Sequence, residues 1–171
     1  MYLLNNVKFH QDIQRTIGDT QYPPGWFRDP LERAKIGVVE VPDPVHPDPD
    51  MYITTENPDG SLTVIDRSIE ERTQIAANKK NQIQSNIVQQ TQERLDAFAQ
   101  TRGYDSVLSA CTYATSGIPK FATEGQYMVN MRDATWGKLY SIMESVKAGT
   151  TPMPTGFSDI EPLLPVLVWP I

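Results

Sequence analysis

Apolar residues in the middle of the chain recur at helical spacing over a long stretch without helix breakers. Residues 61–102 contain neither glycine nor proline, and Ser68 with Glu71 three positions later forms a capping box, a usual start of a helix. The pattern therefore predicts one long helix over residues 68–102. Its apolar stripe consists of Ile69, Ala76, Ile83, Ile87, Val88, Leu95 and Phe98.

This stripe is thin, because most other positions of the predicted helix are Gln, Asn, Thr or charged residues. A helix draws most of its stability from packing an apolar face, so this one needs a cover. The sequence leaves two ways to bury the apolar stripe. Either the C-terminal region packs on the stripe, or identical copies of the chain pair along it in a short, imperfect coiled coil.

Short apolar runs separated by turn residues characterise residues 1–67 and predict a small β-rich module. A first strand is expected between Tyr2 and Phe9, and a second over residues 36–41, ended by Pro42. The firmest local prediction is a hairpin around a Pro-Asp-Gly turn, because proline presets φ and glycine supplies positive φ. Its expected strands are residues 51–55 and 61–65.

A short helix and a linker complete this region. Asp29 is suited to cap a helix whose first residue is Pro30, and Gly37 is suited to stop it. Residues 42–50 alternate proline with acidic residues and predict an extended, polyproline-like linker.

Residues 103–171 predict a compact helical domain with an extended apolar tail. A second helix is expected after a cap at Tyr104-Asp105, and a third over residues 122–147, stopped by Gly149. The tail needs to pack on its own helices or on a partner. The whole chain is thus expected to be α+β. The expected buried face of the second helix consists of Val107, Leu108, Cys111 and Ala114. On the third helix the residues at helical spacing are Val129, Arg132, Trp136, Leu139, Tyr140, Met143 and Val146.

Composition excludes several classes of function. Fifteen Lys and Arg against 21 Asp and Glu give a net charge of −6, and the basic residues are scattered, which argues against nucleic-acid binding. No apolar run reaches the roughly 20 residues of a membrane-spanning helix, and the first residues lack the pattern of an export signal, so a soluble protein is expected. The single cysteine, Cys111, excludes an internal disulfide and a zinc site built on several thiolates.

Few residues suggest chemistry. His46 lies among Asp43, Asp48 and Asp50, but prolines at alternate positions keep these side chains from converging, so a linker is favoured over a metal site. Cys111 lacks a base, because both histidines lie in the other half of the chain, and it is expected to be a small core residue.

The carboxylates of Glu124, Asp133 and Glu144 are assigned to helix surfaces or caps, and no catalytic motif accompanies them. The sequence therefore predicts no catalytic, cofactor-binding or metal-binding residue. The aromatic group around Trp26-Phe27 is assigned to a small aromatic core, with a docking surface for a partner as the alternative.

Residues 90–171 resemble the C-terminal domain of small accessory or fibre-assembly proteins of tailed bacteriophages. The resemblance is carried by RLDAFAQTRGYD at 94–105, SACTYATS at 109–116, EGQY at 124–127 and RDATW at 132–136. The front half is more weakly similar through YPPGWF at 22–27, and the closing Trp169-Pro170 is similar to the ends of fibre-assembly chaperones. No binding residue follows from this resemblance, since the family is functionally ill-defined.

The resemblance implies a non-enzymatic component of the virion tail, made in the host cytoplasm and associated with the tail fibre or baseplate. Other tail, fibre or baseplate proteins are the expected partners, together with further copies of the chain, plausibly as a trimer. The first alternative is a fibre-assembly chaperone that binds the fibre tip. A second, from another class, is a small glycan-acting enzyme with paired carboxylates.

Overall fold

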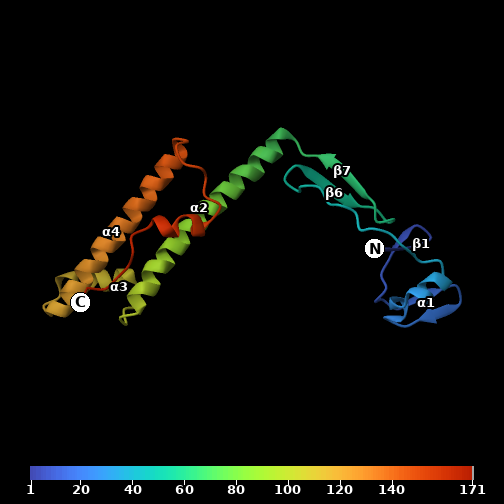
Figure 1. The fold of residues 1–171 in the computed structure, drawn as a ribbon, viewed down its shortest axis with the longest axis horizontal. Coiled ribbons are helices and arrows are strands. Elements are labelled where there is room, and N and C mark those ends of the chain that lie inside the picture. Colours follow the sequence, from blue (N-terminus) through green and yellow to red (C-terminus); the bar gives the residue numbers. More distant parts are fainter. Residues whose placement is uncertain (171) are drawn as a thin grey trace. The chain divides into compact units, whose positions relative to one another are not determined.

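The computed structural model describes residues 1–170, with small antiparallel sheets in the N-terminal part and helices in the C-terminal part (Figure 1). The fold is α+β, as the sequence predicts. The chain divides into two compact units, Met1–Ala76 and Ala77–Ile171. The long helix α2, Ile69–Gln100, begins in the first unit and continues into the second.

A three-stranded antiparallel sheet opens the first unit. Strand β1 (Tyr2–Leu4) pairs with both β2 (Val7–Phe9) and β5 (Val39–Glu40). The single strand expected between Tyr2 and Phe9 is thus wrong, because Asn5 and Asn6 turn the chain with φ of 51° and 62°. Asparagine tolerates this left-handed conformation better than most residues.

A second hairpin was not expected from the sequence. Strands β3 (Arg15–Ile17) and β4 (Thr20–Tyr22) pair in register around Gly18, whose φ is 59°. Their six residues have little apolar alternation, which is the usual signal of a strand.

Helix α1 (Pro30–Lys35) has the predicted cap and stop. The Asp29 carboxylate accepts a hydrogen bond of 2.8 Å from the Leu31 amide, and Gly37 follows the helix with φ of 76°. The strand predicted over residues 36–41 is shorter than expected, because Ile36 ends the helix and only Val39 and Glu40 pair.

The predicted Pro-Asp-Gly hairpin is confirmed, with strand bounds shifted by one residue. Strands β6 (Tyr52–Glu56) and β7 (Leu62–Asp66) pair antiparallel, with Ile53 opposite Ile65. Gly60 has φ of 77°, which supplies the turn.

The aromatic core of the first unit is also confirmed. Phe9 and Phe27 are buried and meet edge to face, with ring centroids 4.7 Å apart. Tyr22 and Trp26 pack against Phe27 from outside, and Val38 completes the buried cluster. Such ring geometries stabilise beyond the area they bury.

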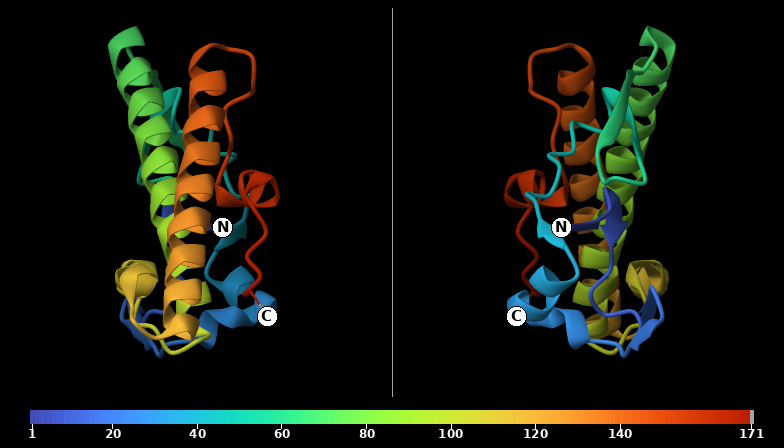
Figure 2. Two further views of the ribbon diagram at one scale, coloured as in Figure 1. Left: turned by 90° about the vertical axis from the view of Figure 1, so that its left-hand side faces the viewer. Right: turned by 90° about the vertical axis from the view of Figure 1, so that its right-hand side faces the viewer.

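In the second unit, the C-terminal part of α2 and helix α4 (Pro119–Lys147) run antiparallel side by side (Figures 1 and 2). Helix α3 (Val107–Thr112) and the 3₁₀ turn Tyr113–Thr115 lie against α4 near its start. The C-terminal region thus covers the apolar stripe of α2 from Ile83 onward.

Two buried clusters hold this unit together. One gathers around Leu95 and Met128, and the other around Ile87, Leu139 and Ile142. Between them in sequence lie Thr91 on α2 and Thr135 on α4, both fully buried. Along both helices, a buried threonine therefore separates the residues of the two clusters. The first cluster comprises Leu95, Ala99, Tyr104, Val107, Ala110 and Met128, and the second Ile87, Leu139, Ile142, Ile160 and Leu164.

Two details of the predicted helices are wrong. Ser106, not Tyr104-Asp105, caps α3, with its hydroxyl accepting the Ser109 amide at 3.2 Å, and Leu108 is 57% exposed. The buried residues of α4 are Glu124, Gly125, Met128, Thr135, Leu139 and Ile142, while Tyr140 is 64% exposed.

The apolar tail packs on its own helices. Ile160 and Leu164 enter the second cluster, next to the short 3₁₀ turns Phe157–Asp159 and Glu161–Leu163. Trp169 stacks on Phe98 with ring centroids 4.6 Å apart. The tail is therefore an integral part of the unit; its final residue, Ile171, lies outside the described residues.

Candidate interaction surface

Glu124, a candidate carboxylate from the sequence, is buried and already engaged. It is 5% exposed, and its two oxygens accept hydrogen bonds of 2.8 Å from Arg102 Nη1 and from the Tyr104 hydroxyl. Burial and the Glu124 hydrogen bond raise the pKa of Tyr104 to about 12. This carboxylate therefore joins Arg102 and Tyr104 to α4 by an ion pair and a hydrogen bond.

Two other polar residues of α2 clamp distant segments. Asp96 accepts the Val107 amide at 2.8 Å and thereby holds the start of α3. Arg94 donates to the Pro165 carbonyl at 2.9 Å, and its Nε lies 3.8 Å from Glu161, so it holds the tail. Hydrogen bonds to charged groups contribute more to stability than neutral ones.

Gly125 allows the closest backbone approach in this unit. A Cβ at this position would lie 2.3 Å from the Ala114 amide nitrogen, so no side chain fits. Three of the segments that carry the sequence resemblance therefore contact one another: Arg102 and Tyr104 bind Glu124, and Gly125 lies against Ala114.

The acidic histidine segment does not form a metal site. Asp43 lies 2.7 Å from the Met1 amino group, while the Asp48 carboxylate accepts the Asp50 amide at 2.9 Å. Within residues 1–170, no three His, Cys, Asp or Glu side chains gather as metal ligands would.

Cys111 is half-buried on α3, and burial raises the pKa of its thiol. A raised pKa keeps the sulfur protonated, whereas nucleophilic cysteines have a lowered one. Of the remaining candidate carboxylates, Glu144 pairs with Lys147 at 2.7 Å on the surface of α4, and Asp133 lies 3.8 Å from Arg132.

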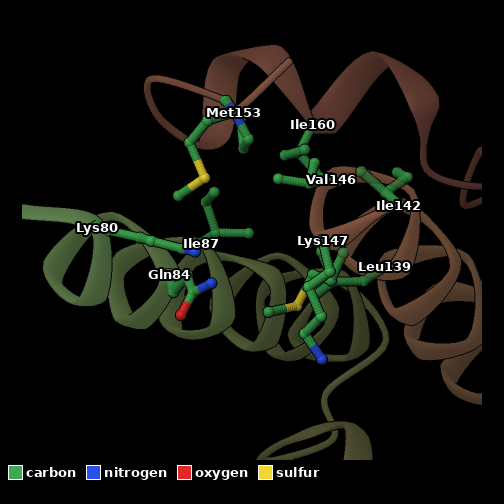
Figure 3. Close-up of a pocket in the computed structure, with 11 residues that line it drawn as sticks. Lys80, Gln84, Ile87, Leu139, Ile142, Val146, Lys147, Met153 and Ile160 are labelled. Atoms are coloured by element: carbon green, nitrogen blue, oxygen red, sulfur yellow. The ribbon is translucent and has the colours of Figure 1, made fainter. Parts of the chain in front are cut away.

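An apolar hollow lies where the loop before Ile160 crosses the helix pair. Met153 reaches down from this loop toward Ile87 on α2, and Leu139 and Ile142 line the opposite side (Figure 3). Its free volume is about 20 Å³, room for roughly one water molecule. This hollow is the end of the core and is too small for a ligand.

A larger open groove is lined by residues of both α2 and α4. Its volume is about 640 Å³, and Val88 of α2 lines it together with Trp136 and Tyr140 of α4. Arg132 also lines it, and the Nε of this residue is buried without a hydrogen-bond partner among the described residues. Aromatic residues, Met and Arg are the types enriched at protein interfaces. The complete lining is Val88, Gln92, Arg132, Asp133, Trp136, Gly137, Leu139, Tyr140 and Met143.

The sequence identifies several groove residues only by their helical spacing. Trp136 and Tyr140 have helical spacing with Leu139, which does not say which of the three are buried. In the structure Leu139 is 1% exposed and Tyr140 is 64% exposed. An exposed Tyr beside a half-buried Trp is the signal that marks the groove, and it requires knowledge of what packs on α4.

Apolar side chains are also exposed in the first unit. On the β6–β7 hairpin, the cross-strand pair Ile53 and Ile65 is 37% and 56% exposed, and Val64 on the other face is 47% exposed. Ile69, at the start of α2, is 82% exposed. The turn of the hairpin is held by the Lys8 amide, which donates to the Pro58 carbonyl at 2.6 Å, but these side chains remain exposed. This part of the chain is therefore a second candidate surface for contact with another protein.

Two further findings bear on function. Over residues 1–170, no helix combines the length and apolarity needed to cross a membrane. Comparison with protein-family models, curated proteins and solved structures finds no match. Function is therefore argued from the surfaces described above and from the resemblance of residues 90–171.

Proposed function

We propose that this protein is a non-enzymatic component of a bacteriophage tail, associated with the tail fibre or baseplate, that acts through protein–protein contacts. The resemblance of residues 90–171 names the setting. The geometry supplies one observation in support: the polar groups in the resembling segments join parts of the second unit to one another, while interface-type side chains are left on its surface.

Glu124 carries this observation most directly. Both of its oxygens are hydrogen-bonded, one to Arg102 and one to Tyr104, and its side chain is 6% exposed. General acid–base catalysis needs a carboxyl group within reach of a substrate proton. A structural role for this carboxylate fits a module that folds tightly and presents surfaces to neighbours.

A census of purified phage particles tests the proposal. Quantitative mass spectrometry is expected to find this chain at several copies per particle, at a constant ratio to a known tail protein across independent preparations. Its presence in infected-cell lysate but absence from particles would favour the fibre-assembly chaperone instead.

A second measurement separates the enzyme alternative. Purified protein is incubated with host surface polysaccharide, and no release of oligosaccharide is expected. Release that disappears on Asp133→Asn or Glu144→Gln, two exposed carboxylates of α4, would overturn the non-enzymatic proposal.

A further inference from the structure

The first turns of helix α2 carry side chains that the rest of the described chain leaves in water. Among residues 69–82 only Arg72 and Ile75 are partly covered, and residues 76–82 are all exposed. A helix draws most of its stability from packing an apolar face. Residues 69–82, the open segment of α2, therefore lack the support that the second cluster gives to the helix further on.

Apolar and small residues of the open segment line up with the covered side of α2. Ile69 is exposed and precedes the buried Ile87 by about five helical turns, so both side chains lie on the same side of the helix. Thr73 and Ala76 lie close to the same line, and Ala77 borders it. Short side chains let another helix approach closely. This side of the open segment is therefore suited to a helical partner.

Charges at the two ends of the open segment decide which helix fits. Glu70 near its start and Lys80 near its end are both exposed, and neither forms an ion pair with another residue in the described part of the chain. The helix dipole favours an acidic residue in the first turn, but Lys80 lies in the middle of a 32-residue helix, beyond the reach of either end. The open segment thus presents a negative and a positive charge about 15 Å apart along its axis.

Two copies of the chain satisfy this charge pattern when their open segments run antiparallel. With a two-fold axis at the level of Ile75, Glu70 of each copy lies at the level of Lys80 of the other, and Thr73 lies at the level of Ala77. Parallel copies would instead place glutamate beside glutamate and lysine beside lysine. A three-helix bundle with cyclic symmetry has parallel helices, so the same charges disfavour a trimer along this segment.

We propose that the open segment is a self-association surface at which two copies of the chain form an antiparallel dimer. The apolar and small residues on its exposed side are buried between the two helices, and the Glu70 carboxylate of each copy pairs with the Lys80 ammonium of the other. The contact extends over only about 21 Å of helix, less than a standard interface, so the dimer dissociates at low micromolar concentration. This inference concerns self-association alone and does not depend on the setting in which the protein works.

Sedimentation equilibrium of the full chain, from about 10 μM to about 1 mM, tests the proposal. The unaltered protein is expected to show a monomer–dimer equilibrium without trimer. Glu70→Lys and Lys80→Glu each turn two attractions into two repulsions and should raise the dissociation constant by about tenfold. Lys138→Glu, an equal charge change at an exposed position of α4, should leave the dissociation constant unchanged. Circular dichroism checks that each variant keeps its helix content.

Combining the two charge reversals separates this dimer from other modes of association. Glu70→Lys and Lys80→Glu in the same chain restore opposite charges across the antiparallel pair, so the dissociation constant should return to that of the unaltered protein. A parallel pair would respond to neither single reversal, because each replaces one like-charged contact by another. A protein that stays monomeric at all concentrations, a trimer, or single reversals without effect would overturn the proposal. A double variant that dimerises no better than the single ones would contradict it as well.

Discussion

The two halves of helix α2 belong to one continuous helix, yet different forces hold them. At its start Ile69 is 82% exposed, whereas Leu95 in the second half is fully buried. The second half is covered by α3, α4 and the tail, which turn its apolar stripe into a core. The same apolar residue types therefore contribute to stability in one half and remain in water in the other.

Local contacts take the place of a core in the first half. The Ser68 hydroxyl accepts the Glu71 amide at 3.1 Å, and the Glu71 carboxylate accepts the Ser68 amide at 2.8 Å. Arg72 reaches back to Asp66 at 3.5 Å. Such contacts contribute tenths of a kcal/mol to about 1 kcal/mol each. The first half is therefore expected to open more readily than the second.

The largest expected effect comes from one substitution made in both halves. Ile87→Ala removes a side chain that is 4% exposed in the second cluster and should lower the free energy of unfolding by about 2–4 kcal/mol, from lost burial and the cavity left behind. Ile69→Ala, at 82% exposure, should change it by less than about 0.5 kcal/mol. Urea unfolding followed by circular dichroism measures both. Equal losses would contradict the division of α2 into covered and uncovered halves.

The same contrast extends to two glycines of α4. Gly125→Ala places a methyl group 2.3 Å from the Ala114 amide nitrogen and should destabilise by about 1–3 kcal/mol or more, because backbone has to move. Gly137→Ala meets open space and should raise helix stability by up to about 1 kcal/mol. Thermal unfolding of the two variants side by side is the measurement. A Gly125→Ala protein as stable as the original would mean that the Tyr113–Thr115 turn does not pack on α4 as described.

A smaller effect depends on pH and concerns the covered end of α2. Burial, then the Glu124 hydrogen bond, raises the Tyr104 pKa from its ordinary value of 10 to about 12. The folded protein therefore keeps the phenol proton that the unfolded chain releases. This contribution to stability is complete below pH 10 and is lost as pH rises toward 12, by at most about 1.4 kcal/mol per pH unit.

Tyr104→Phe provides the matched control for this pH dependence. Urea unfolding is measured at pH 9, 10 and 11, values that lie below the raised pKa of about 12 and around the ordinary value of 10. Over this range the free energy of unfolding should fall more steeply with pH for the unaltered protein than for the variant. An ultraviolet titration of the folded protein should lose its component with a pKa of about 12 on Tyr104→Phe. If the free energy of unfolding falls equally steeply with pH in both proteins, Tyr104 does not have the raised pKa that its burial and its hydrogen bond to Glu124 predict.

The smallest expected effect sharpens the view of the uncovered half. Ser68→Ala removes the cap hydroxyl and should cost about 0.5–1 kcal/mol, confined to the first turns of α2. Hydrogen exchange should then accelerate at amides of residues 71–76 and stay unchanged near Leu95. Acceleration spread over the whole helix would show that α2 opens as one unit.

Features that depend on neighbouring residues could be predicted from the sequence. The capping box at Ser68, the Asp29 cap before Pro30, and the turn at Gly60 each rest on contacts within a few positions of the chain. The long helix follows from the lack of breakers. The β3–β4 hairpin was missed, because its residues carry no alternation and Gly18 alone is a weak turn signal.

The candidate surface could be predicted only in part. The sequence places Trp136, Tyr140 and Arg132 at helical spacing on one helix, but it does not tell which side of that helix is buried. The buried side of α4 is set by Met128, Thr135 and Leu139. The spacing of residues along a helix predicts which side chains share a face. Which face is buried depends on the segments that pack on the helix.

Local sequence signals were thus sufficient to predict the long helix, the caps at Ser68 and Asp29 and the turn at Gly60, but not the cap of α3 or the turn between β3 and β4. Its tertiary contacts determined which apolar residues became core and which remained as a groove. Arg94 and Pro165 are 71 residues apart, and Trp169 donates to Thr101 across 68 residues. Whether a side chain is buried depends on such distant segments of the chain packing together. The residue pattern of one segment does not show which other segment will pack on it.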